Sequence, residues 1–195
     1  VKTSGEALLA LIDGILDFSR IEAGKLDLVA EVFDLHALVE GVVELLAPRA
    51  QGKGIEIATF VARGTPRRVI GDGDRLRQVL VNLAGNAVKF TDIGGVGICV
   101  SRGERGAVEI AVHDTGPGIQ AQRIPLLFEE FEQGDGSPSS RHGGTGLGLA
   151  ITRRIVARMQ GEVQVDSKVG QGSVFKVSLP LPDADGHAPQ AEQDE

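Results

Sequence analysis

The sequence predicts an α+β fold: a two-layer sandwich in which helices cover one face of a mixed, mostly antiparallel sheet, preceded by one long amphipathic helix. Three observations support this prediction. Segments with strand alternation follow one another mostly without a helix between them, which is typical of antiparallel and mixed sheets. Other segments place apolar residues at helical spacing. The 195 residues, 42% of them hydrophobic and 24% charged, suffice for one domain and an additional segment.

Residues 1–24 predict the long first helix. Its apolar side chains recur at steps of three and four residues: Leu8, Leu11, Ile12, Ile15, Phe18 and Ile21. So broad an apolar face needs a packing partner, either the domain that follows or a helix outside this chain, and we favour the partner helix. We therefore divide the chain into this helix with its connection (1–30), the sandwich (31–182) and a tail (183–195).

The sandwich segment contains helices and strands in a readable order. They are a helix from 35 that ends before Gly52 and Gly54, strands at 55–61 and 67–70, a helix at 75–91, strands at 96–100 and 107–114, a short helix at 123–133, a helix at 147–160, and strands at 162–166 and 173–180. Asp34 is the predicted N-cap of the first helix, and Asp72 or Asp74 that of the next. Residues 134–144, dense in Gly and Ser, predict a mobile lid.

Composition limits the kinds of partner. The tail lacks periodicity, which predicts a disordered acidic tail or linker; its five acids leave 22 acids against 20 bases elsewhere. A near-neutral body predicts no nucleic-acid partner.

Without an apolar run of about 18 residues or a signal peptide, we expect a cytoplasmic segment that makes no membrane contact. A longer parent protein anchored through other segments stays compatible with this. A single cysteine, Cys99, excludes an intrachain disulfide.

Three constellations carry candidate chemistry. On the 75–91 helix, Asn82, Asn86 and Lys89 fall in one sector, where a carboxamide oxygen can ligate Mg²⁺ and an ammonium can meet phosphate. The alternative is a solvated helix face. Asp114 ends a strand and begins the run DTGPGI, in which a carboxylate can accept from an exocyclic amine. The alternative here is an ordinary turn.

The third constellation is the glycine run GGTGLG at 143–148, which opens a helix. Free backbone N–H groups and the helix dipole favour phosphate oxygens at such a position. No Lys-Ser/Thr pair follows, so this is not a Walker A loop, and it is not the strand-linked dinucleotide fingerprint. A purely structural loop is the alternative. The three constellations in this order are more specific than any one of them.

The segments RQVLVNLAGNAVKFT, DTGPGI, LFEEFEQ, GGTGLGLAI and VGQGSVF resemble, in order, the conserved boxes of sensor histidine kinases of the GHKL ATPase superfamily, whose fold is the Bergerat sandwich. Upstream, LLALIDGILDFSRIEAGKLDL resembles the second helix of that family's dimerisation and phosphotransfer hairpin. The resemblance covers nearly the whole chain. It implies a domain that binds ATP with Mg²⁺ and donates a phosphoryl group.

The resemblance also implies a role for individual residues. Asn86 would ligate Mg²⁺ with Asn82 beside it, Lys89 would contact phosphates, and Asp114 would bind the adenine amino group. Further nucleotide or lid contacts would come from Gly116, Gly118, Ile119, Phe128, Phe131, Arg141, Gly144, Thr145, Gly146, Leu147, Gly148 and Ser173. Among these, the two phenylalanines would anchor the lid, the arginine would reach the γ-phosphate, the glycine loop would wrap the phosphates, and the serine would lie near adenine.

The phospho-accepting histidine of the family is missing. None of the four histidines, His36, His113, His142 and His187, lies in a motif that resembles His-Glu-x-Arg-Thr-Pro. We therefore expect no catalytic acceptor in this chain and no autophosphorylation in cis. The acceptor would lie on a histidine-bearing hairpin helix, in a missing segment or another chain. A response-regulator receiver domain and a homodimer through 1–24 are further expected partners.

Two other functions stay open. One is a nucleotide-sensing regulatory module of the same fold without catalysis, and the other is a GHKL-type protein serine kinase. Two features favour the protein-histidine kinase: the resemblance of the 1–24 helix to the phosphotransfer hairpin, and the FEEFEQ segment. Asn82 stands where other GHKL ATPases carry a water-activating Glu, so we expect slow hydrolysis.

Overall fold

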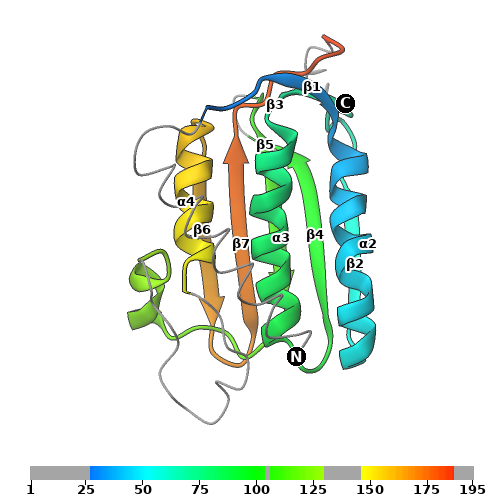
Figure 1. The fold of residues 1–195 in the computed structure, drawn as a ribbon. Coiled ribbons are helices and arrows are strands. Elements are labelled where there is room, and N and C mark those ends of the chain that lie inside the picture. Colours follow the sequence, from blue (N-terminus) through cyan, green and yellow to red (C-terminus); the bar gives the residue numbers. More distant parts are fainter. Residues whose placement is uncertain (1–26, 104–105, 130–145, 187–195) are drawn as a thin grey trace, which may run out of the picture.

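Figure 1 shows the architecture in a computed structural model that describes residues 27–103, 106–129 and 146–186. The elements are β1 (Glu31–Asp34), α2 (Leu35–Lys53), β2 (Glu56–Val61), β3 (Arg68–Gly71), α3 (Gly73–Phe90), β4 (Gly95–Arg102), β5 (Val108–Asp114), the 3₁₀ helix η2 (Ala121–Leu126), α4 (Gly148–Arg158), β6 (Glu162–Lys168) and β7 (Gly172–Leu179). Helices α2, α3 and α4 cover one face of the main sheet, which confirms the predicted α+β sandwich. The predicted helix at 1–24 and the predicted lid at 134–144 lie outside the described residues.

The main sheet is mixed. Its five strands lie in the order β2, β4, β5, β7, β6, and every neighbouring pair is antiparallel except β2 with β4. A parallel pair requires a crossover, which the chain between these two strands supplies through β3 and α3. This confirms the predicted mixed, mostly antiparallel sheet. It also places α3 over the middle of the sheet (Figure 1).

Two aspartates begin the first two described helices. Asp34 accepts a hydrogen bond from the Ala37 N–H at 2.9 Å, and Asp72 accepts one from the Arg75 N–H at 2.9 Å. Each carboxylate satisfies a first-turn N–H that has no partner within the helix. Gly54 ends α2 in the left-handed region, with φ of 69°. Helix α2 therefore ends only at the second of the two glycines predicted to stop it.

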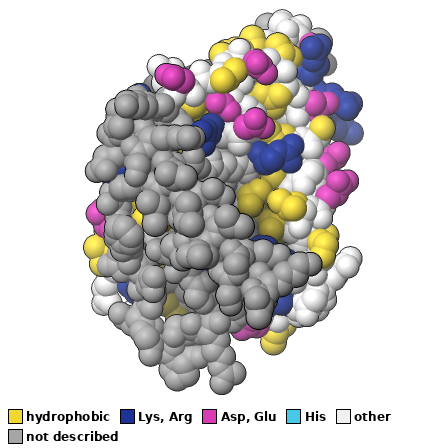
Figure 2. Space-filling view, in the orientation of Figure 1, with side chains coloured by type: hydrophobic (Ala, Val, Ile, Leu, Met, Phe, Trp, Pro, Cys, Tyr) yellow, Lys and Arg dark blue, Asp and Glu magenta, His cyan; other side chains and the backbone are white. Residues whose placement is uncertain are grey.

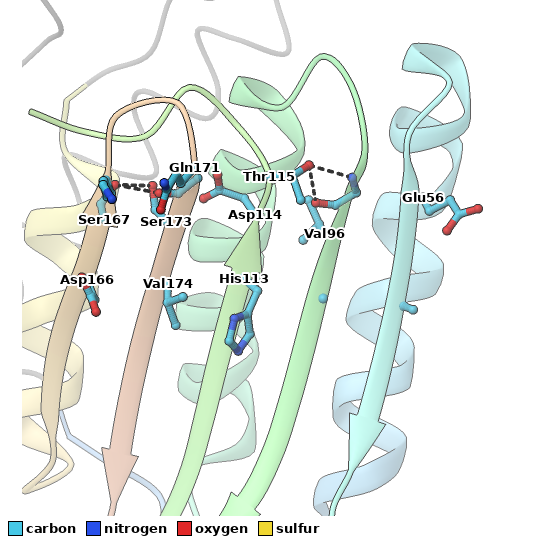
Figure 3. A pocket seen from close by; sticks show the side chains of 15 residues that line it. Glu56, Val96, His113, Asp114, Thr115, Asp166, Ser167, Gln171, Ser173 and Val174 are labelled. Atoms are coloured by element: carbon cyan, nitrogen blue, oxygen red, sulfur yellow. Dashed lines mark hydrogen bonds between the residues drawn. The ribbon is translucent and has the colours of Figure 1, made fainter.

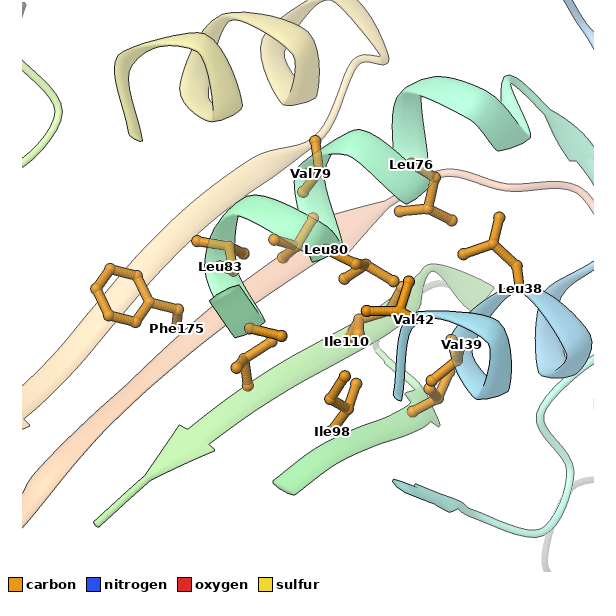
Figure 4. Close-up of a cluster of buried hydrophobic side chains, with 14 of the residues drawn as sticks. Leu38, Val39, Val42, Leu76, Val79, Leu80, Leu83, Ile98, Ile110 and Phe175 are labelled. Atoms are coloured by element: carbon orange, nitrogen blue, oxygen red, sulfur yellow. The ribbon is translucent and has the colours of Figure 1, made fainter. Parts of the chain in front are cut away.

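The hydrophobic core lies between the helix layer and the sheet (Figure 4). Its buried side chains come from both layers: Leu38, Val39, Val42, Leu76, Val79, Leu80, Leu83, Ile98, Ile110 and Phe175. Along β5, Val108, Ile110 and Val112 are buried, while the residues between them are more exposed. Successive strand side chains point to opposite faces, so the next member of the buried row, Asp114, lies on the helix side of the sheet.

A second sheet at one end of the molecule was not predicted. Strand β1, with the sequence EVFD, pairs antiparallel with β3, and Phe33 lies opposite Val69. Four residues without clear alternation give little strand signal in the sequence. The pairing with β3, rather than local propensity, makes this segment a strand.

The tail begins later than predicted. Beyond β7, the Ile70 N–H donates to the Pro182 carbonyl at 2.9 Å, and the Ala184 N–H donates to the Arg68 carbonyl at 2.9 Å. Asp183 forms a β-bridge with Val69. The predicted disordered tail from residue 183 is therefore wrong at its start. Residues 182–184 satisfy the backbone groups along the second edge of β3, which would otherwise lack partners.

The predicted short helix at 123–133 differs in type and start. The structure has a 3₁₀ helix at Ala121–Leu126, and the described chain in this region continues only to residue 129. Pro125 lies inside the 3₁₀ helix. Two hydrogen bonds here join residues three apart, from the Arg123 N–H to the Gln120 carbonyl and from the Leu127 N–H to the Ile124 carbonyl, which is the pattern of a 3₁₀ helix.

Charges of both signs share the surface on the helix side. In the described part of this view, Lys and Arg side chains are interspersed with acidic and hydrophobic ones (Figure 2). One exposed pair joins Arg67 to Asp34 at 2.9 Å and so ties the start of α2 to the segment before β3. Across the described ranges, no helix is both long enough and apolar enough to cross a bilayer.

Lys53 connects the ends of α2 and α3. Its ammonium donates to the carbonyl oxygens of Val88 at 3.1 Å and Lys89 at 2.8 Å, and it pairs with Asp92 at 3.0 Å. The last carbonyls of a helix have no partner within it, and the helix dipole favours a cation there. Lys53 therefore fixes the last turn of α3, which carries Lys89.

We expect Lys53→Met to lower the free energy of unfolding by about 1.5–3 kcal/mol, because it keeps most of the stem and removes a charged donor. Urea denaturation measures this loss. Asp92→Asn is the matched control: its side chain is 78% exposed, so its loss should stay below about 1 kcal/mol. Equal losses in the two variants would show that the surface ion pair, and not the carbonyl contacts, supplies the stability.

Candidate functional site

The polar border of α3 forms one wall of the candidate site. Leu83 and Ala87 bury one side of the helix, while Asn82, Asn86 and Lys89 lie half-buried beside them. At a rise of 1.5 Å per residue, the row from Asn82 to Lys89 is about 10 Å long. It presents two carboxamides and one ammonium to the same region. The apolar row orients them, because it can pack only toward the sheet.

Lys89, at the end of this wall, has a partly buried ammonium group. Its ammonium lies 4.7 Å from the centre of the Phe90 ring. Burial lowers the pKa of Lys89 below its ordinary value. A partly desolvated cation interacts more strongly with an anion than one in bulk water does. The side chain is therefore suited to contact a phosphate.

The start of α4 lies against this wall. The Asn82 side-chain amide donates to the Gly148 carbonyl at 3.4 Å. The N-cap residue Leu147 makes no side-chain capping hydrogen bond, and Gly146 before it has a φ of 70°. First-turn N–H groups and the positive end of a helix dipole favour anions. Asn82 thus joins two predicted parts of the site that are far apart in the sequence.

Asp114 lies at the opposite end of the wall, at the end of β5. Its Oδ1 accepts a hydrogen bond from the Gly116 N–H at 2.8 Å. In the sheet register it stands opposite Ser173, the second residue of β7. A Cβ on Gly116 would lie 2.9 Å from Asp114 Oδ1 and 3.2 Å from the Phe90 carbonyl. The last turn of α3 and the end of β5 therefore meet here.

The charge of Asp114 is tuned by two opposing effects. Burial raises the pKa of Asp114 above its ordinary value of 3.8. The Gly116 N–H and the backbone and hydroxyl of Ser173 act in the opposite direction by hydrogen bonding to the carboxylate. The net effect is a raised pKa. The carboxylate is thus poorly hydrated and keeps acceptor capacity for a ligand donor.

The turn after Asp114 depends on glycine. Gly118 has a φ of 69°, and a Cβ there would collide with the Lys168 carbonyl on β6. Gly172, with a φ of 93°, would collide with the Asp114 carbonyl in the same way. A left-handed residue in so close an approach has no room for a side chain. These glycines let the segment after Asp114 lie directly on the β6–β7 hairpin.

Ser167 is a site residue that the sequence did not reveal. Its hydroxyl accepts from the Ile119 N–H at 2.8 Å and lies 2.9 Å from the Ser173 hydroxyl (Figure 3). It therefore connects the turn after Asp114 with β7. A serine near the end of a polar strand carries no motif of its own. Only the predicted pairing of the last two strands could have drawn attention to it.

The structure describes most of the predicted site residues but not all. The predicted residues within the described ranges are Asn82, Asn86, Lys89, Asp114, Gly116, Gly118, Ile119, Phe128, Gly146, Leu147, Gly148 and Ser173, whereas Phe131, Arg141, Gly144 and Thr145 lie outside them. Contacts join Asn82 to Gly148, and Asp114 to Gly116 and Ser173. Phe128 is partly buried and packs against the core.

A shallow hollow of about 530 Å³ lies near Asp114, mostly on the other side of the sheet. Its lining includes Glu56, His113 and Asp166, whose positions along their strands face away from the helices. Asp114, Ser167 and Ser173 border it at the end of the strands (Figure 3). The hollow is therefore not the space between α3, α4 and Asp114.

Known proteins are similar in sequence to this chain over most of its length. Hybrid signal transduction histidine kinase L of Dictyostelium discoideum is 44% identical over 184 residues, and sensor protein GacS of Pseudomonas syringae pv. syringae is 44% identical over 191 residues. These alignments cover 92% and 94% of this chain. The chain spans only 11% and 21% of the length of these relatives.

The fold is also shared with a solved structure. The crystal structure of full-length ShkA in complex with AMPPNP matches with a TM-score of 0.85 and 42% identity, over 93% of this chain and 37% of that one. A family model described as histidine kinase-, DNA gyrase B- and HSP90-like ATPase matches residues 71–183. This match includes α3, Asp114 and Ser173. The chain therefore belongs to the histidine kinase-, DNA gyrase B- and HSP90-like ATPase family, in which its named relatives are sensor histidine kinases.

Proposed function

We propose that residues 31–182 form the domain of a sensor histidine kinase that binds ATP with Mg²⁺ and donates the phosphoryl group. The observation that carries this proposal is the Asn82–Gly148 contact, which joins the α3 wall to the first turn of α4. With Asp114 near the far end of the same wall, the site offers an acceptor for a base and cationic groups for phosphates. The ShkA structure, a complex with an ATP analogue, supports the same reading.

Adenine would bind at the Asp114 end. An exocyclic amine donates hydrogen bonds, and a partly buried carboxylate with Gly116 and Ser173 beside it is suited to accept one. We assign Gly116, Gly118 and Ile119 to the backbone around the base. The glycine conformations described above let that backbone approach the ring closely.

The phosphates would bind at the α4 end. The glycine loop from Gly144 to Gly148 and Arg141 would neutralise their charge, and Lys89, nearer the Asp114 end of the wall, would contact them with its long side chain. Phe128 and Phe131 would anchor the lid at 134–144. Within the described ranges, no group of three or more His, Cys, Asp or Glu side chains could hold a metal ion. Mg²⁺ accepts few protein ligands when phosphate oxygens and water complete its shell. The carboxamide oxygen of Asn86 suits that role, and the bound ion would offset phosphate charge.

The chemistry is phosphoryl transfer to a histidine outside the assigned site. The bond from the γ-phosphorus to the β,γ-bridging oxygen breaks, ADP leaves, and the histidine nitrogen forms the new bond to phosphorus. This reaction depends mainly on positioning and charge stabilisation, which the residues above supply. We propose residues 1–30 as the second helix and connection of the acceptor hairpin, with dimerisation through 1–24 and a receiver domain as the next acceptor.

Transfer itself can be measured with radiolabelled ATP, Mg²⁺ and a separately supplied hairpin that carries the phospho-accepting histidine. We expect labelled hairpin only when the chain and Mg²⁺ are both present. A hairpin with His→Ala at the acceptor position is the control and stays unlabelled. ATP binding without any transfer would favour a nucleotide-sensing module, and label on serine would favour a serine kinase.

Asn86→Ala tests the metal assignment. We expect affinity for Mg²⁺-ATP to fall by about tenfold, corresponding to about 1.4 kcal/mol, because the ion loses a protein ligand. Isothermal titration with Mg²⁺ and with EDTA separates this from general damage. The variant and the parent should bind ATP similarly in EDTA. A parent-like gain from Mg²⁺ in the variant would remove Asn86 from the metal site.

Asp114→Asn tests the base assignment through stability as well as binding. The pKa of Asp114 is higher in the folded chain than the ordinary value of 3.8 that applies to the unfolded chain. The free energy of unfolding therefore falls as the pH rises from about 3.8 through the raised pKa, because Asp114 must lose its proton in the folded state. The variant removes this cost, so without nucleotide its Tm at pH 7.5 should exceed the parent's, and the difference should shrink toward pH 4. Affinity for ATP should fall about tenfold or more, since a charged acceptor is lost.

Thermal unfolding with and without ATP measures both effects. A Tm below the parent's at pH 7.5, with a difference independent of pH, would contradict the assigned cost of the buried charge. Unchanged stabilisation by ATP would contradict the assignment of Asp114 to adenine.

A further inference from the structure

The hydroxyl of Ser167 is the meeting point of three segments. It accepts a hydrogen bond from the Ile119 N–H at 2.8 Å. It also lies 2.9 Å from the Ser173 hydroxyl and donates to the Gly172 carbonyl at 3.0 Å (Figure 3). Ser167 and Ser173 are directly paired in the register of β6 with β7. One hydroxyl thus joins the turn after Asp114 to the strand opposite it.

Ser167 occupies a position that the fold would otherwise fill with an apolar side chain. In β6, Val163 and Val165 are half-buried on the helix side and pack against the core, and Ser167 continues their row. An apolar residue there would leave the Ile119 N–H without its acceptor. The Gly170 N–H also donates to the Pro117 carbonyl, at 2.7 Å. The turn is therefore held on the β6–β7 hairpin at two points, one of them Ser167.

The hydroxyl protons allow two arrangements. Each serine hydroxyl has one proton to donate. In the first, Ser167 donates to Ser173, and Ser173 donates to the Asp114 carboxylate. In the second, Ser173 donates to Ser167, and Ser167 donates to the Gly172 carbonyl. The second arrangement frees carboxylate lone pairs for another donor. Ser167 therefore lets Ser173 turn toward Asp114 or away from it.

We propose that Ser167 is a positioning residue for base selection: it holds Ile119 and directs the Ser173 hydroxyl so that Asp114 can accept from the exocyclic amine of a purine. This inference rests on the proposed function, because it concerns the same nucleotide site. Ser167 acts through Asp114 and the turn at Ile119. Its effect should therefore depend on the base and leave phosphate binding largely intact.

ATP and ITP, both with Mg²⁺, provide the test, since ITP carries an oxygen where ATP carries the amine. A site built around an acceptor rejects the analogue that lacks the donor. We expect the parent chain to prefer ATP in isothermal titration, and Ser167→Ala to reduce this preference by about tenfold. Affinity for ITP should change less than about threefold. Ser167→Thr keeps the hydroxyl and should keep the preference.

Further variants make the outcome decisive. Ser178→Ala, the same change on the side of β7 away from the helices, should leave both affinities unchanged. Ser173→Ala removes the hydroxyl that Ser167 directs, so adding Ser167→Ala to it should lower the ATP preference less than Ser167→Ala does in the parent chain. Ser167→Cys keeps a similar volume with a weaker hydrogen-bonding group, and it replaces the alanine variant if that fails to fold.

Equal losses for ATP and ITP, or an unchanged ATP preference in Ser167→Ala, would overturn the inference and leave the proposed function intact. A parent chain that binds neither nucleotide would instead overturn the proposed function, and the inference with it.

Discussion

The alternation of side chains along β5 is the constraint on which the site depends. Val108, Ile110 and Val112 can be buried only on the helix side, and this places Asp114 on the same side at the strand's end. A shift of register by one residue would turn the whole row outward. The buried row and the carboxylate are therefore one feature of the fold. The position of Ser173 follows from it, because β7 pairs with β5 in a fixed register.

The residues around Asp114 bring polar groups and backbone close together at a local cost in folding stability. A partly buried carboxylate, glycines with no room for a Cβ and hydroxyls shared between partners all restrict what the local sequence can be. Each brings backbone or a polar group close to one point. Such local costs are typical of functional sites, where the rest of the fold supplies the stability. The core beneath α2 and α3 supplies it here.

Prediction from sequence succeeded where a local signal was strong. The predicted caps, Asp34 and one of Asp72 or Asp74, and the long apolar rows located the helices closely, and the structure selects Asp72. The alternating segments located the main strands. It failed where pairing decides the structure: β1 is a strand only through β3, and residues 182–184 are held on β3 as well. Ser167 belongs to the same class, since its role arises from strand register and not from a motif.

Strand β3 has neighbours on both edges, and these neighbours are the first and last paired segments in the described part of the chain. Residues 31–34 lie along one edge and residues 182–184 along the other. With strands about 4.8 Å apart, the incoming and outgoing chain are separated there by about 10 Å. A unit connected at two such adjacent points can be inserted between other domains with little rearrangement of either neighbour. This geometry suits a module that makes up a small fraction of much longer chains.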